Sequence, residues 1–189
     1  MPRFCFYHAG CPDGFGAAFA VWKAWGDEAR YVARGHDDDP LEAGRFENAV
    51  ATFVDISPSN DEMRSLASHV RELTVLDHHV TARDRFETEP RVVELMASKG
   101  HQIHFDMNHS GAILAWQHFH YDQEPPALLR YVEDQDLWNW TLPDSEQVNA
   151  ALMSYARRFD VWSQLLEKPI EELAREGESI VRSNQIQVK

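Results

Sequence analysis

The sequence contains little of what would tie it to an oxidising compartment or to a membrane. Cys5 and Cys11 are the only cysteines among 189 residues and they do not form a CxxC pair, which excludes a disulfide framework. No stretch approaches the ~20 apolar residues of a membrane span, and Met1-Pro2-Arg3 begins without the organisation of a signal peptide. We therefore expect a reduced, cytoplasmic protein with no membrane contact.

Basic residues are also scarce. Lys and Arg number 18 against 31 Asp and Glu, which gives a formal net charge of −13. Binding to duplex nucleic acid requires a basic face, so this balance argues against a duplex as partner. A small anionic substrate remains compatible with it, because bound divalent ions reverse the local field.

Short apolar runs alternate with helical periodicity over the first half of the chain. Strands are expected at residues 4–7, 31–33, 52–55, 73–76 and 102–106, and helices at 14–25, 60–70 and 85–98. This alternation predicts an α/β fold with a parallel five-stranded sheet flanked by helices. The second half is mostly helical, with helices expected at 112–119, 125–132, 147–155, 159–166 and 170–183. We expect an α/β domain over residues 1–140, with 141–189 as a helical extension that packs on it or leads out of it.

Polar side chains follow three of the expected strands. Asp77-His78-His79 follows the run 73–76, Asp55 follows the run 51–54, and His8 and Asp13 flank a loop after the first run. The carboxyl ends of parallel strands meet at one edge of the sheet, where open α/β folds bind ligands. Aspartate and histidine are ligands of first-row transition metals. The pattern predicts one polynuclear metal site, although a lone strand-end aspartate also serves to cap a helix.

A later acidic segment, Glu133-Asp134-Gln135-Asp136, carries three acids within four residues at a helix end. Such a cluster is either solvated or bound to cations. Trp138 and Trp140 follow it, and they either pack as core anchors or line the mouth of a cleft and stack on a base.

Taken together, these segments resemble the DHH phosphoesterase superfamily, and in particular its bacterial and phage phosphohydrolase subgroup. The likeness rests on His8 with Asp13-Gly14, on Asp55, on the tripeptide 77–79, on Asp134, and on His109-Ser110-Gly111. It implies two Mn²⁺ or Mg²⁺ ions at one site. Asp55 would bridge the ions, His8 would bind the first, and the second would be bound by Asp13, His78 and Asp134.

The resemblance also implies roles around the metals. His79 would face the substrate phosphate, and Asp77 would orient the neighbouring imidazole. The helix start at His109, Ser110 and Gly111 would lie near the phosphate. Asp136 is a possible additional ligand.

The sequence departs from the family pattern in two places. Cys11 stands where an aspartate is expected, so it is either a thiolate ligand that favours softer metals or a buried bystander. Gly177 is the only glycine after Trp140, so we do not expect these residues to form the glycine-rich carboxy-terminal substrate domain of the family. The chain is then either a truncation or a single-lobed form.

The expected activity is metal-dependent hydrolysis of a phosphoester in a small phosphorylated substrate, such as a short oligonucleotide, a cyclic nucleotide or a nucleoside bisphosphate. A non-catalytic module that binds nucleotide or metal is one alternative. A pyrophosphatase or exopolyphosphatase is another. A homodimer through the end where a second lobe would attach is also possible.

Overall fold

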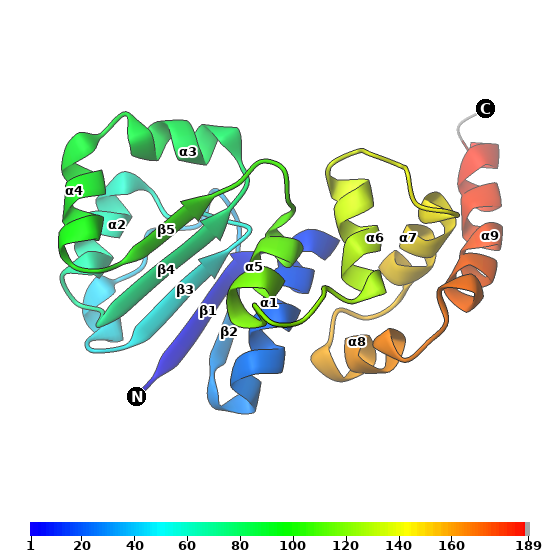
Figure 1. The fold of residues 1–189 in the computed structure, drawn as a ribbon, viewed down its shortest axis with the longest axis horizontal. Coiled ribbons are helices and arrows are strands. Elements are labelled where there is room, and N and C mark those ends of the chain that lie inside the picture. Colours follow the sequence, from blue (N-terminus) through cyan, green and yellow to red (C-terminus); the bar gives the residue numbers. More distant parts are fainter. Residues whose placement is uncertain (188–189) are drawn as a thin grey trace.

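The computed structural model describes residues 1–187 and contains a parallel sheet. Its strands are β1 (Arg3–His8), β2 (Arg30–Arg34), β3 (Val50–Val54), β4 (Glu72–Asp77) and β5 (Gln102–Phe105), in the order β2-β1-β3-β4-β5. Figure 1 shows helices against both faces of this sheet. The α/β fold with five parallel strands is therefore confirmed.

Alternate strand residues enter separate cores on the two faces of the sheet. Cys5 and Leu76 belong to one core, together with side chains of α1 (Pro12–Trp25) and α5 (Gly111–Phe119). Phe6 and Val75 belong to the other, which is covered by α2 (Asn60–Ala67), α3 (Val80–Glu87) and α4 (Pro90–Ser98). Because side chains alternate between faces, a strand buried on both sides reads as a continuous apolar run.

The single helix expected over residues 85–98 is wrong, because this segment contributes to two helices. The first, α3, begins at Val80, directly after the Asp-His-His tripeptide, and ends at Glu87. Glu89 has non-helical backbone (φ −124°, ψ 80°), and Pro90 begins α4. Proline has no amide hydrogen and disfavours a helical residue before it, so a helix starts readily at Pro90 but does not run through it.

The second half is helical, as expected. It contains α6 (Ala127–Asp136), α7 (Ser145–Ser154), α8 (Phe159–Leu166) and α9 (Ile170–Gln187), while short 3₁₀ turns lie earlier at Gly26–Glu28 and Ala43–Phe46. Helices α7 and α9 pack together, and the fully buried Trp162 of α8 contacts Phe15 and Phe19 of α1. The helices after residue 140 thus share a core with α1 and α5. Over residues 1–187, no helix combines the length and apolarity needed to cross a membrane.

The strand order creates a reversal point between β1 and β3. The chain passes from β1 to β2 on one side, and β3 then pairs with the other side of β1. Ligands bind at such reversals, in the crevice beyond the carboxyl ends of the strands. His8 ends β1 and Asp55 follows β3, so the topology brings these two side chains to the crevice.

Candidate metal centre

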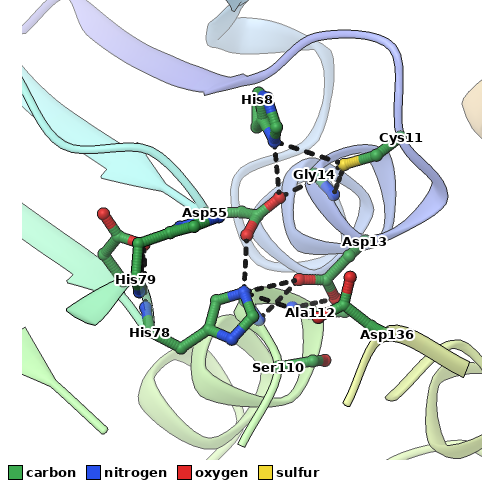
Figure 2. A network of polar contacts seen from close by, with 12 residues as sticks. His8, Cys11, Asp13, Gly14, Asp55, His78, His79, Ser110, Ala112 and Asp136 are labelled. Atoms are coloured by element: carbon green, nitrogen blue, oxygen red, sulfur yellow. Dashed lines mark hydrogen bonds and ion pairs between the residues drawn. The ribbon is translucent and has the colours of Figure 1, made fainter. Parts of the chain in front are cut away.

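Asp55 lies at the centre of the polar cluster. One carboxylate oxygen is 3.4 Å from Nδ1 of His8 and accepts a hydrogen bond from the Cys11 thiol at 3.3 Å. The other oxygen is 3.1 Å from Nε2 of His78. Figure 2 shows Asp55 between these two sets of partners. The backbone of Asp55 is left-handed, with φ 58°, a conformation that non-glycine residues adopt at a cost and that aspartate and asparagine tolerate best.

His78 joins Asp55 to two further carboxylates. Its Nε2 lies 3.6 Å from an oxygen of Asp13 and 3.5 Å from an oxygen of Asp136. Asp13 is fully buried, whereas the side chain of Asp136 is 27% exposed. One imidazole therefore faces three carboxylates that come from α1, from the end of β3 and from α6.

The structure brings Asp136, and not Asp134, to this cluster. The buried carboxylate of Asp134 instead accepts hydrogen bonds from the backbone amide and hydroxyl of Thr141 and from the amide of Leu142. These bonds tie the segment after α6 back onto the helix. Asp134 is thus a structural acceptor, and Asp136 is the acid of this segment that lies within reach of His78.

Asp77 orients His79 and is itself saturated with hydrogen bonds. One oxygen accepts from Nδ1 of His79 at 2.6 Å and from the backbone amides of both His78 and His79. The other oxygen accepts from the hydroxyl of Ser57 at 2.6 Å. Because both oxygens are engaged within the protein, Asp77 fixes the orientation of the His79 imidazole.

The start of α5 does not offer its first amides to a phosphate. The amides of Gly111 and Ala112 donate to the two oxygens of Asp13, at 2.7 and 2.9 Å. The Ser110 hydroxyl caps the helix at the Ile113 amide. His109 lies 3.2 Å from a carboxylate oxygen of Glu133. Of the residues expected to bind substrate, Gly111 therefore holds a site carboxylate in place through its amide. The Ser110 amide instead donates to Glu133 at 2.9 Å.

The electrostatics of the cluster reflect an excess of carboxylates. Burial, followed by the charges of Asp55 and Asp136, raises the pKa of Asp13 well above its usual range. Burial also raises the pKa of Asp136. Burial opposes protonation of His78, but the hydrogen bond to Asp55 and the charges of Asp13 and Asp136 outweigh it and raise the pKa of His78 to about 9. A protonated His78 supplies positive charge where three carboxylates converge.

Cys11 occupies a structural position as well as a place beside His8. It is the amino-terminal cap of α1, where its sulfur accepts from the Gly14 amide at 3.1 Å. The sulfur also lies 3.5 Å from Nδ1 of His8. Burial, and then the charge of Asp55, raises the pKa of the Cys11 thiol to about 12.

The donor atoms form two groups, and Asp55 connects them. His8, Cys11 and Asp55 offer three ligand atoms within 4.8 Å of one another, and so do Asp13, His78 and Asp136. Asp55 also reaches His78 on the second side. Carboxylate and imidazole donors suit Mn²⁺, Mg²⁺, Fe²⁺ and Zn²⁺, and the thiol of the first group favours the softer members of this series. The residues thus fit a pair of divalent ions on either side of Asp55.

Two residues at this edge gave no clear signal in the sequence. The ring of His36 lies 4.7 Å from that of His8 and 5.8 Å from that of His79. His36 follows β2, and only the pairing of β2 with β1 brings it here. Ser57 acts through Asp77, 20 residues further along the chain. Their roles depend on strand order and loop path, which a local pattern does not encode.

The comparisons with known proteins give one relative. No family model matches the chain, and no solved structure matches it significantly. Among curated proteins, the chain is similar to an uncharacterized protein of Acanthamoeba polyphaga mimivirus, with 25% identity over 177 residues. The match covers 87% of this chain but 40% of the viral protein, so the chain spans less than half of that relative's length.

Proposed function

We propose that this chain is a metal-dependent phosphoesterase of the DHH type, which uses two divalent ions, Mn²⁺ or Mg²⁺. The observation that carries the proposal is the placement of Asp55 between two donor groups, one with His8 and Cys11 and the other with His78, Asp13 and Asp136. Three convergent carboxylates around the imidazole of His78 also favour cation binding, since one positive charge on that ring does not balance three negative charges.

The proposed chemistry is hydrolysis without a covalent enzyme intermediate. Two divalent ions, when bound, would polarise the phosphoryl oxygens and lower the pKa of a water molecule to near neutrality. The protein holds the ligand atoms in place through fixed hydrogen bonds, chiefly those from the α5 amides to Asp13. His79 would donate from Nε2 to a phosphoryl oxygen. The hydrogen bond to Asp77 raises the pKa of His79, which favours this donor form.

The proposed substrate is a small phosphorylated molecule: a short oligonucleotide, a cyclic nucleotide or a nucleoside bisphosphate. We place the protein in a reducing cytoplasm, where Cys5 and Cys11 remain free thiols. A second candidate is a non-catalytic module that binds nucleotide or metal, favoured by Cys11 in the place of an expected carboxylate. A pyrophosphatase or exopolyphosphatase would share the metal centre and differ in its leaving group.

The decisive experiment measures the manganese-dependent release of 4-nitrophenol from bis(4-nitrophenyl) phosphate. It compares the wild type with the Asp55→Asn variant. Asparagine tolerates the left-handed backbone of residue 55, so this variant removes the charge without adding backbone strain. Asp144→Asn is a matched control, because Asp144 also has a left-handed backbone (φ 53°) but is exposed and belongs to neither donor group.

We expect kcat/KM of Asp55→Asn to fall at least a hundredfold, because metal-assisted charge stabilisation is lost. Asp144→Asn should keep wild-type activity. Equal activity in the two variants would refute the proposal. Tight binding of nucleotide by a wild-type chain that hydrolyses no phosphoester over hours would favour the non-catalytic module. Hydrolysis of pyrophosphate or polyphosphate, without hydrolysis of phosphoesters, would favour a pyrophosphatase or exopolyphosphatase.

A further inference from the structure

Trp138 is presented to solvent beside the metal centre. Its surface is 76% exposed, although tryptophan is one of the largest apolar side chains. Its backbone is left-handed, with φ 57°, which is unusual for a bulky residue. The Trp140 ring meets it edge-on, with centroids 5.2 Å apart and planes at 81°. An exposed aromatic side chain in a strained conformation points to a role other than packing.

The loop that carries Trp138 is held rigidly. The backbone carbonyl of Asp134 accepts from the amides of Asn139 and Trp140, while its buried carboxylate accepts from Thr141 and Leu142. These bonds fold the chain back at the end of α6, just beyond Asp136. The indole is therefore presented by a fixed turn, and little conformational freedom is lost when a ligand binds against it.

Trp138 lines the same cavity as two acids of the candidate metal centre. A cavity of about 240 Å³ is lined by Asp13, Asp136 and Trp138, together with Pro12, Val132 and Gln135. Two of these residues belong to one metal donor group. A ligand whose phosphate sits at that group therefore has the Trp138 side chain at its flank. Gln135 adds an amide that can both donate and accept hydrogen bonds at the same wall.

We propose that Trp138 is a specificity-determining residue that stacks on an aromatic base attached to the substrate phosphate. This inference rests on the proposed function. It narrows the proposed substrates to nucleotides and excludes sugar phosphates and inorganic polyphosphate. Stacking on an aromatic side chain is tolerant of base identity, because every base offers a π-face. A small chain with an acidic surface thereby gains affinity for a nucleotide without a basic groove.

The test is quenching of tryptophan fluorescence, excited at 295 nm in the presence of Mg²⁺, by adenosine 5′-monophosphate and by ribose 5-phosphate. We expect saturable quenching by the nucleotide and none by the sugar phosphate. In Trp138→Asn, which suits the left-handed backbone, we expect the nucleotide to bind roughly tenfold more weakly by calorimetry. Trp138→Phe should recover part of the affinity. Tyr121→Asn, which removes an aromatic side chain that is 88% exposed and lines no part of the cavity, is the control.

Equal affinity of the wild type for adenosine 5′-monophosphate and ribose 5-phosphate would overturn the proposal, as would unchanged nucleotide affinity in Trp138→Asn. Because binding is measured apart from turnover, failure of the proposed enzyme function is recognised separately, by a wild type that hydrolyses no phosphoester at all.

Discussion

Gly111 packs so closely against Asp55 that a β-carbon at position 111 would overlap the Asp55 side chain. The same residue donates its amide to Asp13 at 2.7 Å. The first turn of α5 therefore fixes two acids of the site at once, one by contact and one by hydrogen bond. This arrangement makes a glycine at the start of a helix a determinant of the candidate metal centre.

For this reason, Gly111→Ala should damage both stability and activity. Relief of the overlap must move α5 or Asp55, and overpacking of this kind costs about 1–3 kcal/mol of the free energy of unfolding. Urea unfolding and phosphodiester hydrolysis measure the two effects. Gly44→Ala is the matched control, because a β-carbon at Gly44 meets no atom within 4 Å. Similar losses in the two variants would show that the close approach of Gly111 to Asp55 is unimportant.

Asp134 and Asp136 should separate stability from activity. Asp134→Asn weakens a charged acceptor of three hydrogen bonds, so we expect a loss of roughly 1–3 kcal/mol in the free energy of unfolding. Asp136→Asn removes one of three convergent carboxylates, so we expect unchanged or increased stability of the metal-free protein and a large loss of manganese-dependent activity. The roles of the two acids would be reversed if Asp134→Asn folded but did not bind Mn²⁺ while Asp136→Asn stayed fully active.

Cys11→Asp should strengthen binding of Mn²⁺ by the group containing His8. Aspartate is a good amino-terminal cap, so α1 is preserved, and a carboxylate is a harder ligand than a thiol. We expect roughly tenfold tighter Mn²⁺ binding or more at that group, measured as free Mn²⁺ by electron paramagnetic resonance. Cys11→Ser keeps the cap without adding a charge and serves as the control. Equal Mn²⁺ affinity in the two variants would show that residue 11 is not a ligand.

His101 should make stability fall at mildly acidic pH. Its Nδ1 accepts from the Leu73 amide at 3.2 Å, and its Nε2 lies 3.4 Å from the Ala67 carbonyl, which suits the neutral ring with the proton on Nε2. Burial lowers the pKa of His101. A lowered pKa in the folded state stabilises the protein fully above the unfolded value of about 6.5, and that contribution declines as pH falls below it.

The measurement is the free energy of unfolding of wild type and His101→Asn between pH 8 and pH 5. We expect the difference between the two proteins to shrink as the pH falls, because protonation removes the advantage of the wild-type ring. A difference that stays constant over this range would contradict the assignment.

The sequence by itself determined the strands and the chemistry at their ends. Strands buried on both faces must be apolar along their length, so their limits and the polar residues that follow them are visible locally. Parallel strands also end at one edge, which predicted that His8, Asp55 and the tripeptide at Asp77 share a site. The prediction of one helix over 85–98 was wrong because it followed the local periodicity and gave too little weight to the break that Pro90 imposes.

Only the tertiary structure decided which acid of the segment 133–136 enters the site. Residues 134 and 136 are separated by about 200° around a helix, so they face nearly opposite sides, and both lie near acidic neighbours in the sequence. The packing of α6 against α1 and α5 turns Asp136 toward His78 and turns Asp134 toward Thr141. Strand order likewise brought His36 to His8, and the docking of α5 gave Asp13 its two amide donors. These choices depend on contacts between residues far apart in the chain, so no local pattern contains them.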